Sequence, residues 1–237
     1  MTGTIINAGA IIAGGIAGLT VARQIPFRYQ TWIKHLLGVF TVYIGLSMTW
    51  AGLNGTWVQI SKQMLIILVS LMLGKATGRL LRLQQLGNRL GQLARQAMSR
   101  TPENRSWDDG FITGSVLFCV APLAILGALQ NGLAGSCRPL VIKAIMDGLT
   151  TLAFARTLGW SVMMSAIPVL AYQGTLTLLA QMAEPVLHQY TLLDSVIATD
   201  GLLVFCVSLV ILELKRIELA DYLPSLAYAP LLTWLWR

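Results

Sequence analysis

Long uncharged apolar runs constrain this chain more than any other feature of its sequence. Residues 4–22 contain no charged side chain over a length that crosses a bilayer as a helix, and several later runs are similar. The chain is 55% hydrophobic and only 11% charged, which is too apolar for a water-soluble protein of its length. Because the runs are continuous rather than alternating, their backbone must form its hydrogen bonds within helices. We therefore predict an all-α fold, a polytopic membrane helix bundle.

The apolar runs predict one transmembrane domain over residues 1–237. It contains about eight helices, or seven if the short last run does not span. Polar turns, prolines and charged segments separate the runs. The predicted spans are residues 4–22, 36–53, 57–80, 110–132, 139–158, 160–182, 195–214 and 222–236.

Several motifs predict departures from a simple bundle. GVFTVYIGLSM at 38–48 and GLLVFCVSLVI at 201–211 share a glycine followed by similar apolar positions. They lie in spans of opposite direction, which suggests an inverted repeat. Pro122 predicts a kink in the fourth span because it removes a backbone donor. Pro168 and Gly174 interrupt an apolar run and suggest a discontinuous helix there.

Glycine pairs at a spacing of four residues predict close helix contacts. Gly14 and Gly18 form one such pair, and Gly74 and Gly78 form another. Small residues at this spacing let a second helix approach closely, either from the same chain or from a second copy. The pattern is therefore compatible with a homodimer.

The basic residues predict the orientation in the membrane. The formal net charge is +7, but the charges gather in a few segments, as in membrane proteins, and we expect no nucleic-acid partner. If the arginine-rich segment 79–109 is cytoplasmic, 13 of the 17 Lys and Arg residues lie inside and both termini lie outside for eight spans. All seven tryptophans fall at predicted span ends, as an aromatic belt requires. The inside set is Arg23, Arg28, Lys34, the seven from Lys75 to Arg105, Arg156, Lys215 and Arg216.

The segment 79–109 contains an amphipathic helix. An apolar stripe recurs at steps of three and four residues between positions 83 and 97, and the polar face is basic. Such a helix lies on an anionic membrane surface, packs under the bundle or docks a partner, and we favour packing. The stripe consists of Leu83, Leu86, Leu90, Leu93 and Ala97.

Ionisable and amide side chains inside the predicted spans mark the candidate site. Lys143 and Asp147 are four residues apart, so a helix places them on one face, and Thr151 continues that face one turn later. An ionisable residue far from a span end is a functional-site candidate by default. The other candidates are polar residues of other spans, namely Asn7, Asn131, Gln173, Thr175 and Asp200.

These groups predict a transporter or channel for a small cation or another small solute. Carboxylate, carboxamide and hydroxyl oxygens, with carbonyls freed near Pro168, are the ligands that replace the water of a small cation. A cation or proton that reaches Asp147 would release Lys143, which makes proton-coupled exchange an option. The only cofactor we expect is a monovalent cation. The three cysteines have no CxxC spacing, and we expect no transition-metal site.

Three other interpretations stay open. A buried Lys143–Asp147 pair can also act as a structural lock of the fifth span. A membrane scaffold or sensor acting through residues 83–97 is the alternative function. An intramembrane enzyme using Asp147 and Asp200 is a third option, but the sequence holds no nucleophile elbow, phosphate loop or HExxH motif, so we expect no enzyme.

Several motifs resemble a known bacterial family. They are GTIINAGAIIAGGIAGL, SLMLGKATGRLLRL, GFITGSVLFCVAPLAILGALQNGL, KAIMDG, AIPVLAYQGTLTLLA and YLPSLAYAPLL. Together they resemble the inner-membrane proteins of domain-of-unknown-function family 554 over nearly the whole chain. The family pattern reads CVG where this chain has CVAP at 119–122. The resemblance implies a multi-pass protein of the bacterial inner (plasma) membrane, and a transporter or a sodium channel or pump.

Overall fold

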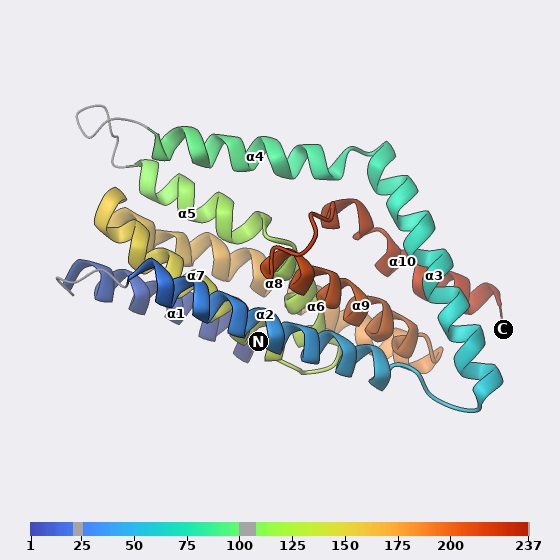
Figure 1. The fold of residues 1–237 in the computed structure, drawn as a ribbon. Helices are drawn as coiled ribbons and strands as arrows, with labels where there is room; N and C mark the ends of the chain where they lie inside the picture. Colours follow the sequence, from blue (N-terminus) through green and yellow to red (C-terminus); the bar gives the residue numbers. More distant parts are fainter. Residues whose placement is uncertain (21–25, 100–107, 237) are drawn as a thin grey trace.

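The computed structural model describes residues 1–20, 26–99 and 108–236. Within these ranges the chain forms helices and turns and contains no strand, which confirms the all-α prediction. Most of the helices lie side by side along one direction and form an elongated bundle (Figure 1). Five residues counted in the topology prediction lie outside the described ranges: Arg23, Arg100, Arg105, Trp107 and Arg237.

The closest helix pair is α1 (Thr2–Thr20) with α7 (Arg138–Leu158). A Cβ atom added to Gly14 would lie 2.1 Å from the carbonyl oxygen of Gly148, and one added to Gly18 would lie 2.4 Å from that of Leu152. The two helices therefore run parallel and touch through their backbones, as small residues allow. Asn7, near the start of α1, is held beside the first half of α7 by this contact.

A second close pair is α2 (Phe27–Ala51) with α9 (Leu193–Ile211). A Cβ atom on Gly45 would lie 2.5 Å from the backbone nitrogen of Phe205, and one on Gly38 would meet Leu212. The pair is therefore antiparallel. These helices hold the two similar segments 38–48 and 201–211, so the two segments pack against each other.

The fourth predicted span is a broken helix. α5 (Asp108–Val120) and α6 (Pro122–Leu133) meet at an angle of 59°. The predicted kink is confirmed, because Pro122 begins α6 and has no backbone donor for the preceding turn. Nine of the 12 residues of α6 are buried, so this short helix lies at the centre of the bundle.

The helix break expected near Pro168 and Gly174 is wrong in its position. α8 (Ala166–Gln189) runs without interruption through Gly174, after a short 3-10 helix, η2 (Trp160–Ser165). Pro168 lies in the first turn of α8, where its missing N–H has no intrahelical partner to lose. No carbonyl is freed in mid-helix there, and the discontinuity lies instead between α5 and α6.

The remaining helices form one side of the molecule. α4 (Leu83–Met98) lies along α5, while α3 (Trp57–Leu80) runs obliquely beside α10 (Ser225–Leu235) (Figure 1). A 3-10 helix, η3 (Leu219–Tyr222), packs on α3 and α4. Gly74 and Gly78 approach Ser225 and Asp221, so this glycine pair is used inside the chain, like Gly14 and Gly18. Neither pair is open to a second copy.

The predicted amphipathic helix is confirmed as α4, but its contact face differs from the predicted stripe. Gly87 and Ala94 face α5, whereas Leu86 and Leu93 are 57% and 53% exposed. The small residues allow α4 to lie close to α5, so the larger leucines are displaced to the edge. α4 therefore packs on the bundle and keeps part of its apolar stripe outside.

Within residues 1–20, 26–99 and 108–236, four to five helical segments are long and apolar enough to cross a membrane. Four helical segments pass on their own, and the bent α5–α6 pair counts as a fifth if it is one span. α10 has 11 residues, about 16 Å, and is shorter than the roughly 30 Å apolar layer. Eight spans therefore stay a prediction. The helix directions fit alternation, since α1 is parallel to α7 and α2 antiparallel to α9.

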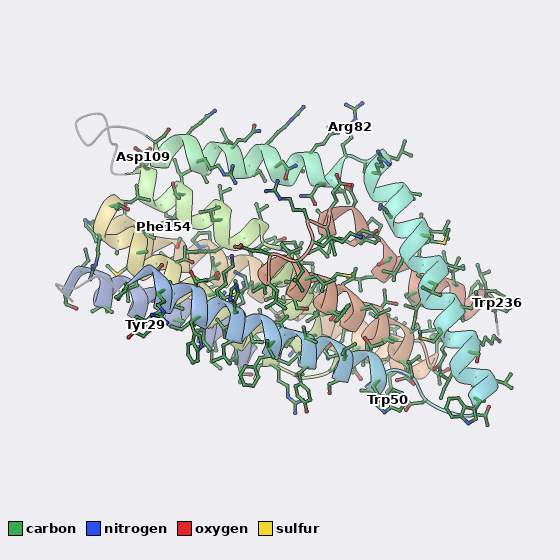
Figure 2. All side chains as sticks on the ribbon, viewed as in Figure 1. Tyr29, Trp50, Arg82, Asp109, Phe154 and Trp236 are labelled. Carbon is green, nitrogen blue, oxygen red and sulfur yellow. The ribbon has the colours of Figure 1, made fainter. Side chains whose placement is uncertain are left out.

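The outer surface is apolar and aromatic, as a bilayer contact requires. Tyr29 and Trp50 project from α2 into the surroundings, while Arg82 projects from the turn between α3 and α4 (Figure 2). α2 begins at Phe27, before the predicted start at 36, because a helix can extend beyond the apolar layer. Described tryptophans occupy exposed positions near helix ends, which fits the predicted belt: Trp32, Trp50, Trp57, Trp160, Trp234 and Trp236.

Candidate functional site

α7 carries a buried ion pair. Lys143 Nζ lies 2.5 Å from Asp147 Oδ2, and the residues are only 2% and 7% exposed. The spacing of four residues on one helix face creates the pair, as the sequence predicted. Thr151, one turn later, donates its hydroxyl to the Asp147 carbonyl at 2.7 Å. This hydroxyl is therefore used by its own helix.

Two amide side chains from other helices extend this ion pair. Asn7 Nδ2 on α1 donates to Gln173 Oε1 on α8 at 3.2 Å, and both residues are fully buried. The Asn7 side chain also lies near the Asp147 carboxylate. Asn7 therefore links α1, α7 and α8 in one polar group, and α1 can supply it only because the glycine contact brings α1 against α7.

Hydroxyls and an aromatic ring surround the polar group. The Thr4 and Thr177 hydroxyls lie 3.4 Å apart, and Thr177 Oγ1 also donates to the Ala128 carbonyl of α6 at 3.2 Å. Lys143 Nζ lies 5.8 Å from the centroid of the Phe118 ring, within cation–π range. The Lys143 ammonium therefore has an acid and a ring face as partners.

Asp200 on α9 is buried in a different way. It is 2% exposed, and neither carboxyl oxygen has a hydrogen-bond partner in the part of the chain that the structure describes. Val204, one turn later, shares an apolar cluster with Leu126 of α6, and Val196, one turn earlier, shares one with Leu133. α6 and α9 therefore run antiparallel, with Asp200 level with the segment between these two leucines.

Gln130 occupies that level on α6. It follows Leu126 by four residues and precedes Leu133 by three, so all three share the face toward α9. This register places Gln130 and Asp200 at a similar level of the α6–α9 contact. The next residue, Asn131, lies about 100° further around α6, on the side where Gly127 packs against Leu140 of α7.

The unpartnered polar atoms of the interior are mostly oxygens. Among the described residues, six buried side-chain polar atoms lack a hydrogen-bond partner, and the only nitrogen in this group is Gln173 Nε2. A buried acceptor needs a donor or a cation, because leaving the acceptor without a hydrogen bond costs free energy. The oxygens are Asn7 Oδ1, Gln130 Oε1, Asn131 Oδ1 and both carboxyl oxygens of Asp200.

A pocket of about 450 Å³ opens next to Gln130. The ends of α2, α6 and α7 form it, and Met48, Arg138 and Ile197 contribute to its lining. Gln130 therefore lies between an opening at this end of the bundle and the carboxyl group of Asp200. Of the residues with an unpartnered oxygen, Gln130 is the one that lines this pocket.

The family of the chain follows from comparison with known proteins. The model of the family "Protein of unknown function (DUF554)" matches residues 2–234. The chain belongs to this family. It is 29% identical over 230 residues to the uncharacterised membrane protein YdfK of Bacillus subtilis, covering 97% of this chain and 94% of YdfK. The resemblance seen in the sequence motifs is thereby confirmed.

A second relative has similar coverage. The uncharacterised protein YqgA of Escherichia coli is 27% identical over 237 residues, which covers 99% of this chain and 97% of YqgA. No solved structure matches. The apolar helices of this chain and the name of YdfK as a membrane protein both indicate a membrane protein.

The structure brings together only some of the predicted site residues. Lys143, Asp147, Asn7 and Gln173 form one group, whereas Thr175 is exposed and bonds the Ala171 carbonyl of its own helix. Thr175 therefore does not join the group. Within the ranges that the structure covers, no set of three or more His, Cys, Asp or Glu residues is placed to hold a metal ion.

Sequence reasoning left Gln130 and Thr4 out of the candidate set. Gln130 and Asn131 are adjacent amides inside an uncharged run, and this was the available signal. Thr4 gave no such signal, because a threonine at a helix start is common. Its contact with Thr177 depends on how α1 lies against α8.

Proposed function

We propose that the protein carries a small monovalent cation across the membrane in exchange for a proton. The observation that carries the proposal is the set of unpartnered buried oxygens, above all the two carboxyl oxygens of Asp200. A cation loses its water inside a membrane protein and needs such oxygens in return. The amide and carboxylate oxygens that have no hydrogen-bond donor meet this requirement.

Asp200 is the first ligand in this proposal. Lys143 already neutralises Asp147, so a cation at Asp147 must displace an ammonium group. Asp200 has no such competitor among the described residues. Gln130, at a similar level to Asp200 and beside the pocket, supplies an amide oxygen.

Exchange follows from the cost of an isolated buried charge. An ionised carboxylate without a partner is unfavourable in an apolar interior. Asp200 is neutralised either by a proton or by a cation, and binding of one excludes binding of the other. Binding of one cation therefore releases one proton, and no covalent step is involved, consistent with our expectation that the protein is not an enzyme.

The Lys143–Asp147 group serves as a second element in the proposal. Asn7 lies near Asp147 and donates to Gln173. A cation or proton that reaches Asp147 would release Lys143, and this change of pairing is a switch between two states.

The test is ion-driven proton movement in proteoliposomes. Wild-type protein, Asp200→Asn, Asp147→Asn and the control Asp108→Asn, at an exposed position, would be reconstituted with a pH-sensitive dye inside. Gradients of Na⁺, Li⁺ and K⁺ would then be imposed. We expect proton movement with at least one ion in wild type and control, and none with Asp200→Asn.

Thermal stability in detergent identifies the ligand independently of transport. A cation that binds only the folded protein raises its melting temperature with concentration. We expect a selective rise in wild type and Asp147→Asn that is absent in Asp200→Asn. Equal rises in all variants, with equal proton movement, would refute the role of Asp200.

A membrane scaffold acting through α4 is the second candidate function. Leu86 and Leu93 stay exposed next to the basic residues Arg82 and Arg89, and this combination is typical of a membrane or partner contact. Leu86→Ser/Leu93→Ser would remove the apolar edge and leave the face toward α5 intact. A cellular phenotype of this variant with unchanged ion exchange would favour the scaffold.

A further inference from the structure

A large groove lies apart from the polar site, at the end of the bundle where the basic residues gather. Its volume is about 1310 Å³, and α3, α4, α9 and the segment 215–222 line it. The pocket beside Gln130 lies at the opposite ends of the helices, near the start of α7. The groove therefore belongs to neither of the buried acids.

The lining of the groove changes from apolar to basic along the helices. On α3, Leu68 and Leu71 precede Lys75, and on α9 Leu203 precedes Lys215 in the segment that follows the helix. α3 and α9 approach the same end, because Lys75 lies over Tyr222, soon after α9 ends. The apolar part is therefore deeper in the bundle, and the charged part lies at its end.

The charges at this end are predominantly positive. Four basic side chains line the groove, and Glu218 is the one acidic residue among its described lining residues. Gln84 and Asn88 of α4 add amide groups that can bind oxygen atoms. The basic side chains are Lys75, Arg95, Lys215 and Arg216.

Specific hydrogen bonds hold the walls of the groove together. Asp221 Oδ1 accepts from the backbone nitrogen of Gln84 at 2.8 Å, in the first turn of α4. Gln84 Oε1 accepts from the backbone nitrogen of Ala220 at 3.2 Å. Asp221 satisfies a free helix donor, so α4 is fixed to η3 at this point. The groove is thus part of the fold and does not depend on a mobile loop.

We propose that this groove binds one anionic phospholipid. An acyl chain would lie against the apolar residues of α3 and α9, and the phosphate would lie among Lys75, Arg95, Lys215 and Arg216. Basic pockets between membrane helices bind acidic headgroups in this way. A free phosphate would use the charges but leave the apolar wall without a partner. The lining is apolar deeper in the bundle and basic at its end, and this arrangement therefore favours a lipid.

The experiment measures lipid binding to the full-length protein in a nonionic detergent. Native mass spectrometry would count bound dioleoyl phosphatidylglycerol, with dioleoyl phosphatidylcholine as the uncharged comparison. The test variant is Lys215→Gln/Arg216→Gln. The matched control is Arg82→Gln/Arg89→Gln, which removes the same charge from exposed positions outside the groove, one in the turn before α4 and one on α4.

We expect phosphatidylglycerol to bind wild type and control at one site, and phosphatidylcholine to bind much more weakly. The test variant should bind phosphatidylglycerol roughly 30-fold more weakly, since each of the two basic residues removed contributes roughly a five-fold gain in affinity for an acidic headgroup. Glu218→Gln should bind it more tightly, because an acidic neighbour of the phosphate is removed. This second variant keeps the proposal testable if Lys215→Gln/Arg216→Gln does not fold.

Three results would overturn the proposal. Equal binding of the two lipids would show a nonspecific apolar contact. Equal loss in test and control variants would show a general effect of net charge. If inorganic phosphate raised the melting temperature of the wild-type protein as much as phosphatidylglycerol does, the groove would be an anion site that needs no lipid. None of these results depends on ion transport, so the proposal stands or fails separately from the proposed function.

Discussion

The two buried aspartates of the bundle differ in their surroundings rather than in their burial. Asp147 has Lys143 one turn away and Asn7 from a neighbouring helix, whereas Asp200 has no hydrogen-bond partner among the described residues. Both are less than one-tenth exposed. Burial therefore marks both as candidates, and the pairing distinguishes their roles. A paired acid stabilises a conformation, while an unpaired one is available to a ligand.

The same difference explains why α7 and α9 need different neighbours. On α7 the acid and its counterion lie on one helix face. The close backbone contact at Gly14 holds α1 against α7 and so brings the Asn7 amide near the pair. α9 places its acid at a similar level to Gln130 of α6, whose amide oxygen has no partner among the described residues. The predictions below test whether this contrast between a satisfied and an unsatisfied acid is real.

The largest effect is expected when the satisfied acid is deprived of its partner. Lys143→Met leaves Asp147 as an unpaired buried charge, and the free energy of unfolding should fall by roughly 3–5 kcal/mol. Unfolding by a denaturing detergent, followed by circular dichroism, measures this value. Asp200→Asn is the comparator and should cost little stability in the absence of a cation, because it breaks no hydrogen bond.

The double variant Lys143→Met/Asp147→Leu controls for the loss of the lysine side chain itself. It removes both charges and should recover most of the lost stability. If the single and double variants are equally unstable, the ion pair does not explain the difference between the two acids.

The next effect concerns the helix contact that delivers Asn7 to Asp147. Gly14→Ala places a methyl group where the Gly148 carbonyl oxygen is 2.1 Å away, so the helices must separate, at a cost of roughly 1–3 kcal/mol. Gly9→Ala, where no atom lies within 4 Å, is the matched control on α1 and should be neutral. The same unfolding assay compares them, and equal effects would contradict the backbone contact.

A smaller effect is expected for the hydrogen bond between the amide side chains of α1 and α8. The Asn7–Gln173 hydrogen bond, 3.2 Å long, should contribute about 0.6 kcal/mol, as is typical between membrane helices. A double-mutant cycle with Asn7→Leu, Gln173→Leu and the double variant measures this coupling. A coupling near zero would mean that Asn7 acts mainly through Asp147.

The smallest effect should come from a paired acid at the surface. Lys34 Nζ lies 2.5 Å from Glu213 Oε1, and the hydrogen bond and charge of Lys34 lower the pKa of Glu213 below its ordinary value of 4.5. Because the folded-state pKa is lower, the pair stabilises the fold above pH 4.5 and loses this contribution as the pH falls through the lowered value.

Glu213→Gln checks this expectation through melting temperatures at several pH values. The small advantage of wild type over the variant should be present at neutral pH, shrink on acidification below about 4.5, and disappear at high salt. An advantage that grows on acidification would contradict the assignment of the pair.

Much of the fold follows from local patterns in the sequence. Apolar length predicts the helices, Pro122 predicts the bend between α5 and α6, and four-residue spacing predicts the Lys143–Asp147 pair. Each of these depends on residues within one or two helical turns. Pro168 misled because its position relative to the helix start decides its effect, and the start of α8 depends on contacts with other helices.

The contacts between helices are the part that the sequence does not reveal. Asn7 and Gln173 are 166 residues apart, and an apolar helix surface carries little information about which partner it meets. Gln130 and Asp200 lie at a similar level because α6 and α9 are antiparallel, with leucines of α6 and valines of α9 in the same apolar clusters. Nothing near Gln130 in the chain indicates this neighbour. A polar residue in a span can therefore be recognised from the sequence, but its partner cannot.

The parallel contact of α1 with α7 has a consequence for the order of assembly during synthesis. α1 leaves the ribosome first, yet its amide partner Gln173 follows 166 residues later, which takes roughly 10 to 30 s at common translation rates. During this interval the Asn7 amide lies in lipid or in the insertion machinery without its final partner. α1 therefore completes its polar contacts only after α8 has been made, although its backbone contact partner α7 precedes α8.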